Sequence, residues 1–223
     1  MIETLFPPDV ETLVATRPMW SAPLLPEEEA CLPPRAVAKR RREYTAGRAA
    51  AREVLARFGI RDFPLRAGAD RAPVWPAGIV GSLSHCGDLC GVAVARDTVF
   101  AGIGLDIEHD RPLEDAILAR ICSEVERVHL EALPGGKERW GIAMFCAKES
   151  VYKCHYPRAR TFLEFHDVSI RLDPKAGRFA ATIHPAGDRD VVGSAALPRR
   201  RLRGRFARDG SYFLAGVVWR IHR

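Results

Sequence analysis

Two acidic residues, Asp106 and Glu108, lie one position apart in a segment that could form a metal site. Residues 102–108 alternate small or acidic residues with branched apolar ones, in the order Gly-Ile-Gly-Leu-Asp-Ile-Glu. This period of two is typical of a β-strand and places both carboxylates on one face. Adjacent carboxylates repel each other unless a cation or a shared proton lies between them, so a divalent ion with oxygen ligands is a natural occupant. A solvated strand face is the alternative.

A third carboxylate, Glu149, lies in a stretch that is otherwise almost wholly apolar. Between residues 140 and 154 the charged residues are Lys148, Glu149 and Lys153. A helix that is apolar nearly all round is buried, so these charges must meet partners other than water. Glu149 and Lys153 are also spaced four residues apart in the order that favours a helix salt bridge, which is the competing explanation.

Ser84 and His85 lie in a small, polar and glycine-rich segment, residues 81–87. We interpret this segment as a turn at a strand edge, where free backbone N–H groups, a hydroxyl and an imidazole could hold a phosphate. Local hydrogen bonding within the turn would explain the pair equally well. The spacing of acidic residues does not mark a hydrolase triad.

Two helices and several strands must position these residues. Residues 38–58 are rich in alanine and arginine, and Gly59 follows at a suitable C-cap position. At 100° per residue, Arg40 and Arg48 share the apolar side of this helix and therefore need partners, whereas two other arginines face solvent. The other predicted elements are a helix over 138–155, a short strand near 12–15, a buried strand over 89–95, and four antiparallel strands within 163–219.

The composition indicates a soluble globular protein. With 223 residues, 47% hydrophobic and 28% charged, the chain suits one large domain or two small packed halves. The N-terminus has no signal-peptide pattern, and no apolar run reaches the ~18 residues of a membrane span, so we expect a cytoplasmic protein. The six cysteines lack Cys-x-x-Cys spacing, which disfavours structural zinc and favours reduced thiols.

The net charge of +6 favours an acidic partner. Much of the basic excess lies in Arg199–Arg205, where alternation with Leu202 is typical of a solvated strand face. A nucleic-acid-binding module would need aromatic residues interleaved with these arginines or a known binding signature, and the sequence shows neither. A Mg²⁺-dependent nucleotide hydrolase is the enzymatic alternative, because carboxylates beside a phosphate site would serve it as well.

Taken in order, three motifs resemble those of the larger, bacterial type of phosphopantetheinyl transferase. The resemblance covers about Ala38 to Tyr156, and the motifs are Gly-Ser-Leu-Ser-His at 81–85, Gly-Leu-Asp-Ile-Glu at 104–108 and Phe-Cys-Ala-Lys-Glu-Ser-Val-Tyr-Lys at 145–153. Asp-x-Glu followed by Lys-Glu-Ser-x-x-Lys is far more specific than either half alone.

The resemblance implies an α+β fold of two similar halves related by a pseudo-twofold axis, each a helix on a small antiparallel sheet. The division would fall near Gly102, giving residues 1–102 and 103–223, with coenzyme A in the cleft between them. The resemblance also implies that Asp106, Glu108 and Glu149 bind Mg²⁺ with the pyrophosphate of coenzyme A. The residues implied around the phosphates and adenosine are Arg40, Arg48, Arg71, Ser84, His85, Lys148 and Lys153.

The implied reaction transfers phosphopantetheine to a serine hydroxyl of an acidic acyl or peptidyl carrier protein and releases adenosine 3′,5′-bisphosphate. Glu149 would accept the serine proton, directly or through water, and Lys153 would stabilise the leaving group. We expect the carrier to dock around residues 112–136, and we expect a monomer that does not bind nucleic acid.

Overall fold

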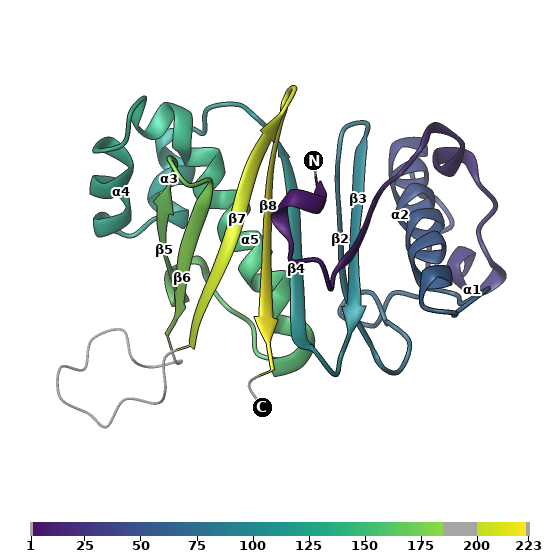
Figure 1. The fold of residues 1–223 in the computed structure, drawn as a ribbon. Coiled ribbons are helices and arrows are strands. Elements are labelled where there is room, and N and C mark those ends of the chain that lie inside the picture. Colours follow the sequence, from purple (N-terminus) through teal and green to yellow (C-terminus); the bar gives the residue numbers. More distant parts are fainter. Residues whose placement is uncertain (1, 185–199, 222–223) are drawn as a thin grey trace.

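The computed structural model describes residues 2–184 and 200–221, which form two antiparallel sheets. The first sheet has the strand order β1-β3-β2 and the second the order β4-β8-β7-β6-β5 (Figure 1). The strands are β1 (Glu11–Val14), β2 (Ile79–Cys86), β3 (Leu89–Arg96), β4 (Phe100–His109), β5 (Val168–Asp173), β6 (Arg178–Ile183), β7 (Arg200–Asp209) and β8 (Tyr212–Arg220).

A long helix packs on each sheet, and shorter helices lie in the segments that connect the strands. Helix α2 (Ala38–Arg57) packs on the first sheet, and α5 (Gly136–Ala159) packs on the second (Figure 1). The shorter helices are α1 (Pro26–Glu29), α3 (Asp115–Ile121) and α4 (Glu124–Glu131), and the 3₁₀ turns are η1 (Ile2–Leu5), η2 (Arg17–Ser21) and η3 (Phe165–Asp167). This arrangement confirms the predicted two-halved α+β fold, although the second half has the larger sheet and carries α3 and α4 beside its long helix.

The core of the first half forms where α2 meets β3. Small residues on one face of α2, among them Ala50 and Ala51, let the helix approach the sheet, and Val54 and Leu55 are fully buried there. The helix ends where sequence reasoning expected, because Gly59 follows with φ +79°, a conformation that favours glycine.

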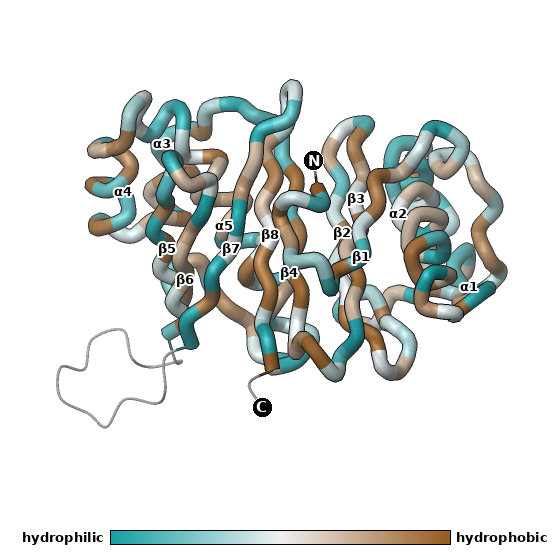
Figure 2. The backbone as a smooth tube through the Cα atoms, viewed as in Figure 1, coloured by the Kyte–Doolittle hydropathy of each residue, from teal (hydrophilic) through white to brown (hydrophobic). Residues whose placement is uncertain are grey.

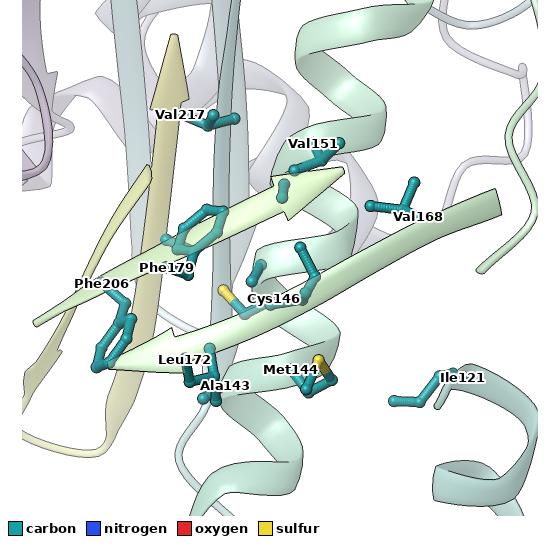
Figure 3. Close-up of a cluster of buried hydrophobic side chains, with 14 of the residues drawn as sticks. Ile121, Ala143, Met144, Cys146, Val151, Val168, Leu172, Phe179, Phe206 and Val217 are labelled. Atoms are coloured by element: carbon teal, nitrogen blue, oxygen red, sulfur yellow. The ribbon is translucent and has the colours of Figure 1, made fainter. Parts of the chain in front are cut away.

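The core of the second half lies between α5 and the inner face of the five-stranded sheet. Figure 3 shows Cys146 and Val151 of α5 packed against side chains of the strands, including Phe179 and Val217. The apolar character of α5 follows from this position, since the helix is enclosed on most sides. Burying a leucine- or phenylalanine-sized side chain contributes about 1.5–3 kcal/mol, so this cluster is a major source of stability.

The outer face of the second sheet is basic where no helix covers it. On β7, Leu202 and Phe206 are buried, whereas Arg201, Arg203 and Arg205 are exposed. Figure 2 shows correspondingly more hydrophilic residues along β7 than along β8. The predicted solvated strand face is therefore confirmed for these arginines, while Arg199 lies outside the described residues.

The two sheets are joined by serine side chains. Backbone ladders hold the strands within each sheet, but between β2 and β4 the Ser82 and Ser84 hydroxyls accept hydrogen bonds from the backbone N–H groups of Leu105 and Ile107, at 3.0 and 3.2 Å. These two bonds satisfy buried donors at the junction. Ser84 and His85 thus lie within β2, and the predicted turn at these residues is wrong: the hairpin turn comes later, at Gly87 with φ +56°.

Helix α5 touches the backbone of β4 at two glycines. A Cβ atom added at Gly102 would lie 2.1 Å from the carbonyl oxygen of Cys154, and one added at Gly104 would lie 1.7 Å from that of Ser150. Neither position can hold a larger residue without moving the helix. Because side chains alternate along a strand, Gly102, Gly104, Asp106 and Glu108 share the face that α5 covers.

Most elements agree with the expectations from the sequence. The predicted helix over 138–155 corresponds to α5, and the four strands of 163–219 correspond to β5 to β8. The six cysteines are free thiols, and no helix among the described residues is long and apolar enough to cross a membrane. The division at Gly102 falls inside β4 and stays a prediction.

We predict that Gly104→Ala destabilises the protein by about 3 kcal/mol, because overpacking at a backbone contact forces the helix away from the strand. Gly47→Ala in α2 is the matched control. Its added Cβ would meet only side-chain atoms at 3.6 Å or more, so it should be neutral or stabilising by about 0.5–1 kcal/mol. Urea unfolding measures both changes. Equal unfolding midpoints for Gly104→Ala and Gly47→Ala would contradict the tight contact between α5 and β4.

Candidate functional site

The contact between β4 and α5 brings the predicted acidic residues together. Asp106 and Glu108 from β4 and Glu149 and Lys153 from α5 line one cavity of about 320 Å³. Ser84 and His85 from β2 complete its wall. Both halves of the chain therefore contribute to this cavity, which we call the carboxylate cavity.

Lys153 pairs with the strand carboxylate. Its Nζ donates to Asp106 Oδ1 at 2.7 Å and to Ser84 Oγ at 3.0 Å, and the Ser84 hydroxyl donates to the same Asp106 oxygen at 3.1 Å. Burial works against the lysine charge, but the Asp106 and Glu149 carboxylates outweigh it and raise the pKa of Lys153. This ion pair joins α5 to β4, so a salt bridge within the helix does not account for Lys153.

The negative charge of the carboxylate cavity is incompletely balanced. Burial and the neighbouring Asp106 raise the pKa of Glu149, and the same two causes raise the pKa of Glu108 to about 7. The second oxygen of Asp106, Oδ2, is buried without a hydrogen-bond partner among the described residues. A cavity with three carboxylates, one lysine and an unsatisfied oxygen favours an added cation.

The donor set suits a hard divalent cation such as Mg²⁺, which prefers carboxylate oxygen and water. In the part of the chain that the structure describes, no three His, Cys, Asp or Glu side chains are already arranged as a metal site. A cation bound through Asp106 must therefore compete with Lys153 for the carboxylate. The assignment of Asp106, Glu108 and Glu149 as ligands remains a proposal.

A second cavity, of about 510 Å³, adjoins the first and is both basic and aromatic. Arg40, Arg48, Arg71, His85 and Lys153 contribute to its lining. Aromatic side chains from both halves complete it: Trp75 from the first half and Tyr152 and Tyr156 from α5. Guanidinium and imidazole groups bind phosphate, and aromatic rings stack on planar bases. We call this the basic pocket.

The arginines of the basic pocket differ in how firmly the protein holds them. Arg48 is 5% exposed, its Nε donates to the carbonyl oxygen of Leu65 at 3.0 Å, and its guanidinium lies 3.8 Å from the centre of the Tyr44 ring. Burial lowers the pKa of Arg48. Arg40 is exposed at the edge of the pocket, and Arg71 is exposed with φ +66°. Arg48 is thus held in place, while the exposed side chains of Arg40 and Arg71 can reorient toward a ligand.

Lys148 lies elsewhere. Its Nζ is 2.9 Å from Glu126 Oε2 and donates to the carbonyl oxygen of Phe165 at 2.8 Å. The Glu126 carboxylate also accepts from the backbone of Ser123 and Ile170. This buried pair ties α4, β5 and α5 together, so the structure does not bring Lys148 to the basic pocket with the other predicted residues.

Lys148 borders a third cavity of about 580 Å³ on the other side of Tyr152. We call it the apolar pocket, because Phe162, Leu163, Phe165 and Val168 form much of its wall. Glu149 lines both the apolar pocket and the carboxylate cavity, and Tyr152 lines both the apolar and the basic pocket. The three cavities are therefore neighbours around one segment of α5.

Sequence reasoning missed several lining residues. Tyr152 and Tyr156 follow Glu149 by three and seven positions, a helical spacing that could have placed them on the same face. Trp75, Asp70 and Glu43 carry no comparable signal, because the fold brings them to the pocket from distant parts of the chain.

Comparisons with known proteins show the family of the chain. Residues 27–95 match the 4′-phosphopantetheinyl transferase N-terminal domain, and residues 102–201 match the 4′-phosphopantetheinyl transferase superfamily. The chain is 40% identical to 4′-phosphopantetheinyl transferase Svp of Streptomyces mobaraensis over 78% of this chain and 71% of that protein.

Two further relatives cover different shares of the chain. It is 32% identical to 4′-phosphopantetheinyl transferase PptT of Mycobacterium tuberculosis, over 98% of this chain and 97% of the relative. It is 36% identical to enterobactin synthase component D of Escherichia coli K12, over 52% of this chain and 54% of that protein. With both family matches in sequence order and near-complete coverage of one relative, the chain belongs to the 4′-phosphopantetheinyl transferase superfamily and is a transferase enzyme.

Proposed function

We propose that the enzyme moves the phosphopantetheine arm of coenzyme A to a serine hydroxyl of an acidic apo acyl or peptidyl carrier protein, with Mg²⁺ held by Asp106, Glu108 and Glu149. The observation that carries the proposal is the order of the three cavities. Coenzyme A has a phosphorylated adenosine, a pyrophosphate and an uncharged arm. The basic pocket, the carboxylate cavity and the apolar pocket suit these parts in that order.

In this arrangement the basic pocket binds the adenosine end. The aromatic side chains face the base, and Arg48, Arg40 and His85 bind phosphate. Because the pyrophosphate belongs beside the carboxylate cavity and Lys153, the Arg40–His85 pair serves the remaining phosphate, on the 3′ position of the ribose. Ser84 acts indirectly, since its hydroxyl holds Asp106 and Lys153.

The chemistry needs one proton acceptor and one stabilised leaving group. Glu149 accepts the proton of the carrier serine, whose oxygen then bonds to the phosphorus that carries pantetheine. The bond from that phosphorus to the bridging oxygen breaks, and adenosine 3′,5′-bisphosphate leaves with the electron pair. Lys153 stabilises its new charge. A bound Mg²⁺ would supply charge neutralisation and fix the pyrophosphate. The raised pKa of Glu149 makes it a better base than an ordinary carboxylate.

The carrier protein docks on α3 and α4 in this proposal. Val125 is 79% and Val128 65% exposed on α4, and Ile117 of α3 is also exposed. Phe162, at the apolar pocket, is exposed as well. Exposed apolar side chains of this kind are typical of a protein interaction site, and those on α3 and α4 lie within the predicted docking region 112–136. We further propose that the enzyme acts as a cytoplasmic monomer.

Mass spectrometry of an apo-carrier incubated with the enzyme, coenzyme A and Mg²⁺ tests the proposed function. We expect the carrier to gain one phosphopantetheine on its serine. A nucleotide hydrolase would cleave coenzyme A without modifying the carrier, and a nucleic-acid-binding protein would do neither.

Glu149→Gln should lower turnover by at least ~10²-fold, because the change removes both a metal ligand and the proton acceptor. Glu138→Gln, at an exposed position of the same helix, is the control and should transfer at close to the normal rate. Both variants should melt near the wild-type temperature. A Glu149→Gln enzyme that melts early but transfers normally would reduce Glu149 to a structural role.

The Mg²⁺ concentration needed for half-maximal transfer should fall as the pH rises through about 7. Burial and Asp106 raise the pKa of Glu108 to about 7, so below this pH the residue holds a proton that competes with the cation. Above it the ionised carboxylate is available. Transfer rates measured against Mg²⁺ at several pH values test this, with Glu108→Gln expected to lose the dependence. An unchanged Mg²⁺ requirement across the range would contradict the assignment.

The KM for an acidic carrier should rise with ionic strength while kcat changes little. The chain carries a net charge of +6, so attraction speeds the encounter and salt screens it. Steady-state kinetics at low and high salt measure the effect. A KM that stays flat would exclude electrostatic steering.

A further inference from the structure

Glu43 is a carboxylate in a pocket that otherwise attracts anions. It lies on α2, is 9% exposed, and lines the basic pocket together with Arg40, Arg48 and His85. A negative charge there opposes the binding of phosphate, because like charges repel most strongly where water is excluded. A carboxylate that weakens phosphate binding must therefore have another role in the pocket. The exposed Lys39, 3.9 Å away one helical turn earlier, gives Glu43 only a weak surface ion pair.

The contacts of His85 suggest that role. Glu43 Oε2 lies 3.6 Å from His85 Nδ1, and Arg40 Nη1 lies 3.3 Å from His85 Nε2. A guanidinium can only donate, so Nε2 must accept the bond from Arg40. The proton of the neutral imidazole is then on Nδ1, the nitrogen that faces the Glu43 carboxylate. The three side chains form a row in which Glu43 selects the tautomer.

The charges that act most strongly on His85 come from α2 and α5, and the carboxylates of Asp106, Glu108 and Glu149 share the carboxylate cavity with it. Burial lowers the pKa of His85, the Glu43 carboxylate opposes this, and the cations Arg40, Arg48 and Lys153 reinforce it. Glu43 and the two arginines belong to α2, and Lys153 belongs to α5. When a phosphate draws the guanidinium of Arg40 to itself, Nε2 is released, and an imidazolium at this point can donate one bond to the phosphate and the other toward Glu43.

We propose that Glu43 is a positioning residue: it holds His85 with Nε2 beside Arg40, so that the two form one binding point for the 3′-phosphate of coenzyme A. Glu43 thereby sets the preference of the enzyme for coenzyme A over dephospho-coenzyme A. This inference rests on the proposed function, which places the pyrophosphate at the carboxylate cavity and leaves this point for the other phosphate.

Isothermal titration of coenzyme A and dephospho-coenzyme A into wild type, Glu43→Gln and Glu53→Gln tests the proposal. Wild type should prefer coenzyme A, and Glu43→Gln should lose about tenfold of that preference, in line with one charge-assisted hydrogen bond. Glu53→Gln removes the same charge from an exposed position of α2 outside the basic pocket and should keep the wild-type ratio. A structural role would lower both affinities together, whereas the proposed role lowers the ratio.

The dependence of the ratio on pH provides a second readout. In wild type the preference for coenzyme A should weaken as the pH rises and His85 loses its proton in the complex. In Glu43→Gln, where the imidazolium lacks its carboxylate, this weakening should occur at lower pH. The same ratio and the same pH profile in both proteins would overturn the proposal.

A third measurement needs no variant and covers the case in which Glu43→Gln does not fold. The ¹⁵N chemical shifts of the His85 imidazole in the ligand-free wild-type protein report its tautomer. We expect Nδ1 to carry the proton; a proton on Nε2 would overturn the proposal. A wild-type protein that binds no coenzyme A would instead defeat the proposed function. If the wild-type protein binds and prefers coenzyme A over dephospho-coenzyme A, and Glu43→Gln keeps the same preference, this inference alone is wrong.

Discussion

The site depends on one close approach, the contact of α5 with β4 at Gly102 and Gly104. Because no side chain separates the two backbones there, the helix lies flat against the strand face that continues into Asp106 and Glu108. Glu149 and Lys153 directly precede Ser150 and Cys154, the two residues that touch the glycines, and both line the cavity that holds Asp106 and Glu108. A larger residue in either glycine position would displace the helix and separate the two halves of the acidic group.

The same contact concentrates charge in a way that stability alone would not favour. Three carboxylates and one lysine share a partly buried cavity, and the result is a raised pKa at Glu108 and Glu149 and an unsatisfied oxygen on Asp106. Charge arranged at an energetic cost is typical of functional sites. In contrast, both side chains of the buried Lys148–Glu126 pair have further hydrogen bonds to the backbone, as expected of a structural link.

Local patterns predicted most elements and the pairing of Asp106 with Glu108 well, because strand and helix periodicity decide which residues share a face. That Glu149 joins this pair was implied by the family resemblance and not by periodicity. Local patterns failed where a partner comes from a distant segment. Lys148 looks equivalent to Lys153 in the sequence, yet tertiary packing pairs it with Glu126, 22 positions away. Its side chain therefore points away from the basic pocket. The small polar neighbours of Ser84 and His85 suggest a turn, but pairing with β3 makes the segment a strand. The carboxylate of Glu43 gave no signal, since its role arises only from its contact with His85.

Paramagnetic ³¹P NMR tests the central claim most directly, namely that the acidic group formed by β4 and α5 binds a metal at the pyrophosphate and not at the Arg40–His85 point. Mn²⁺ would replace Mg²⁺ in a complex of the enzyme with coenzyme A. The account predicts that the two pyrophosphate resonances broaden far more than the 3′-phosphate resonance, and that Asp106→Ala abolishes the broadening specific to the enzyme. Equal or greater broadening of the 3′-phosphate, or no change in Asp106→Ala, would contradict it.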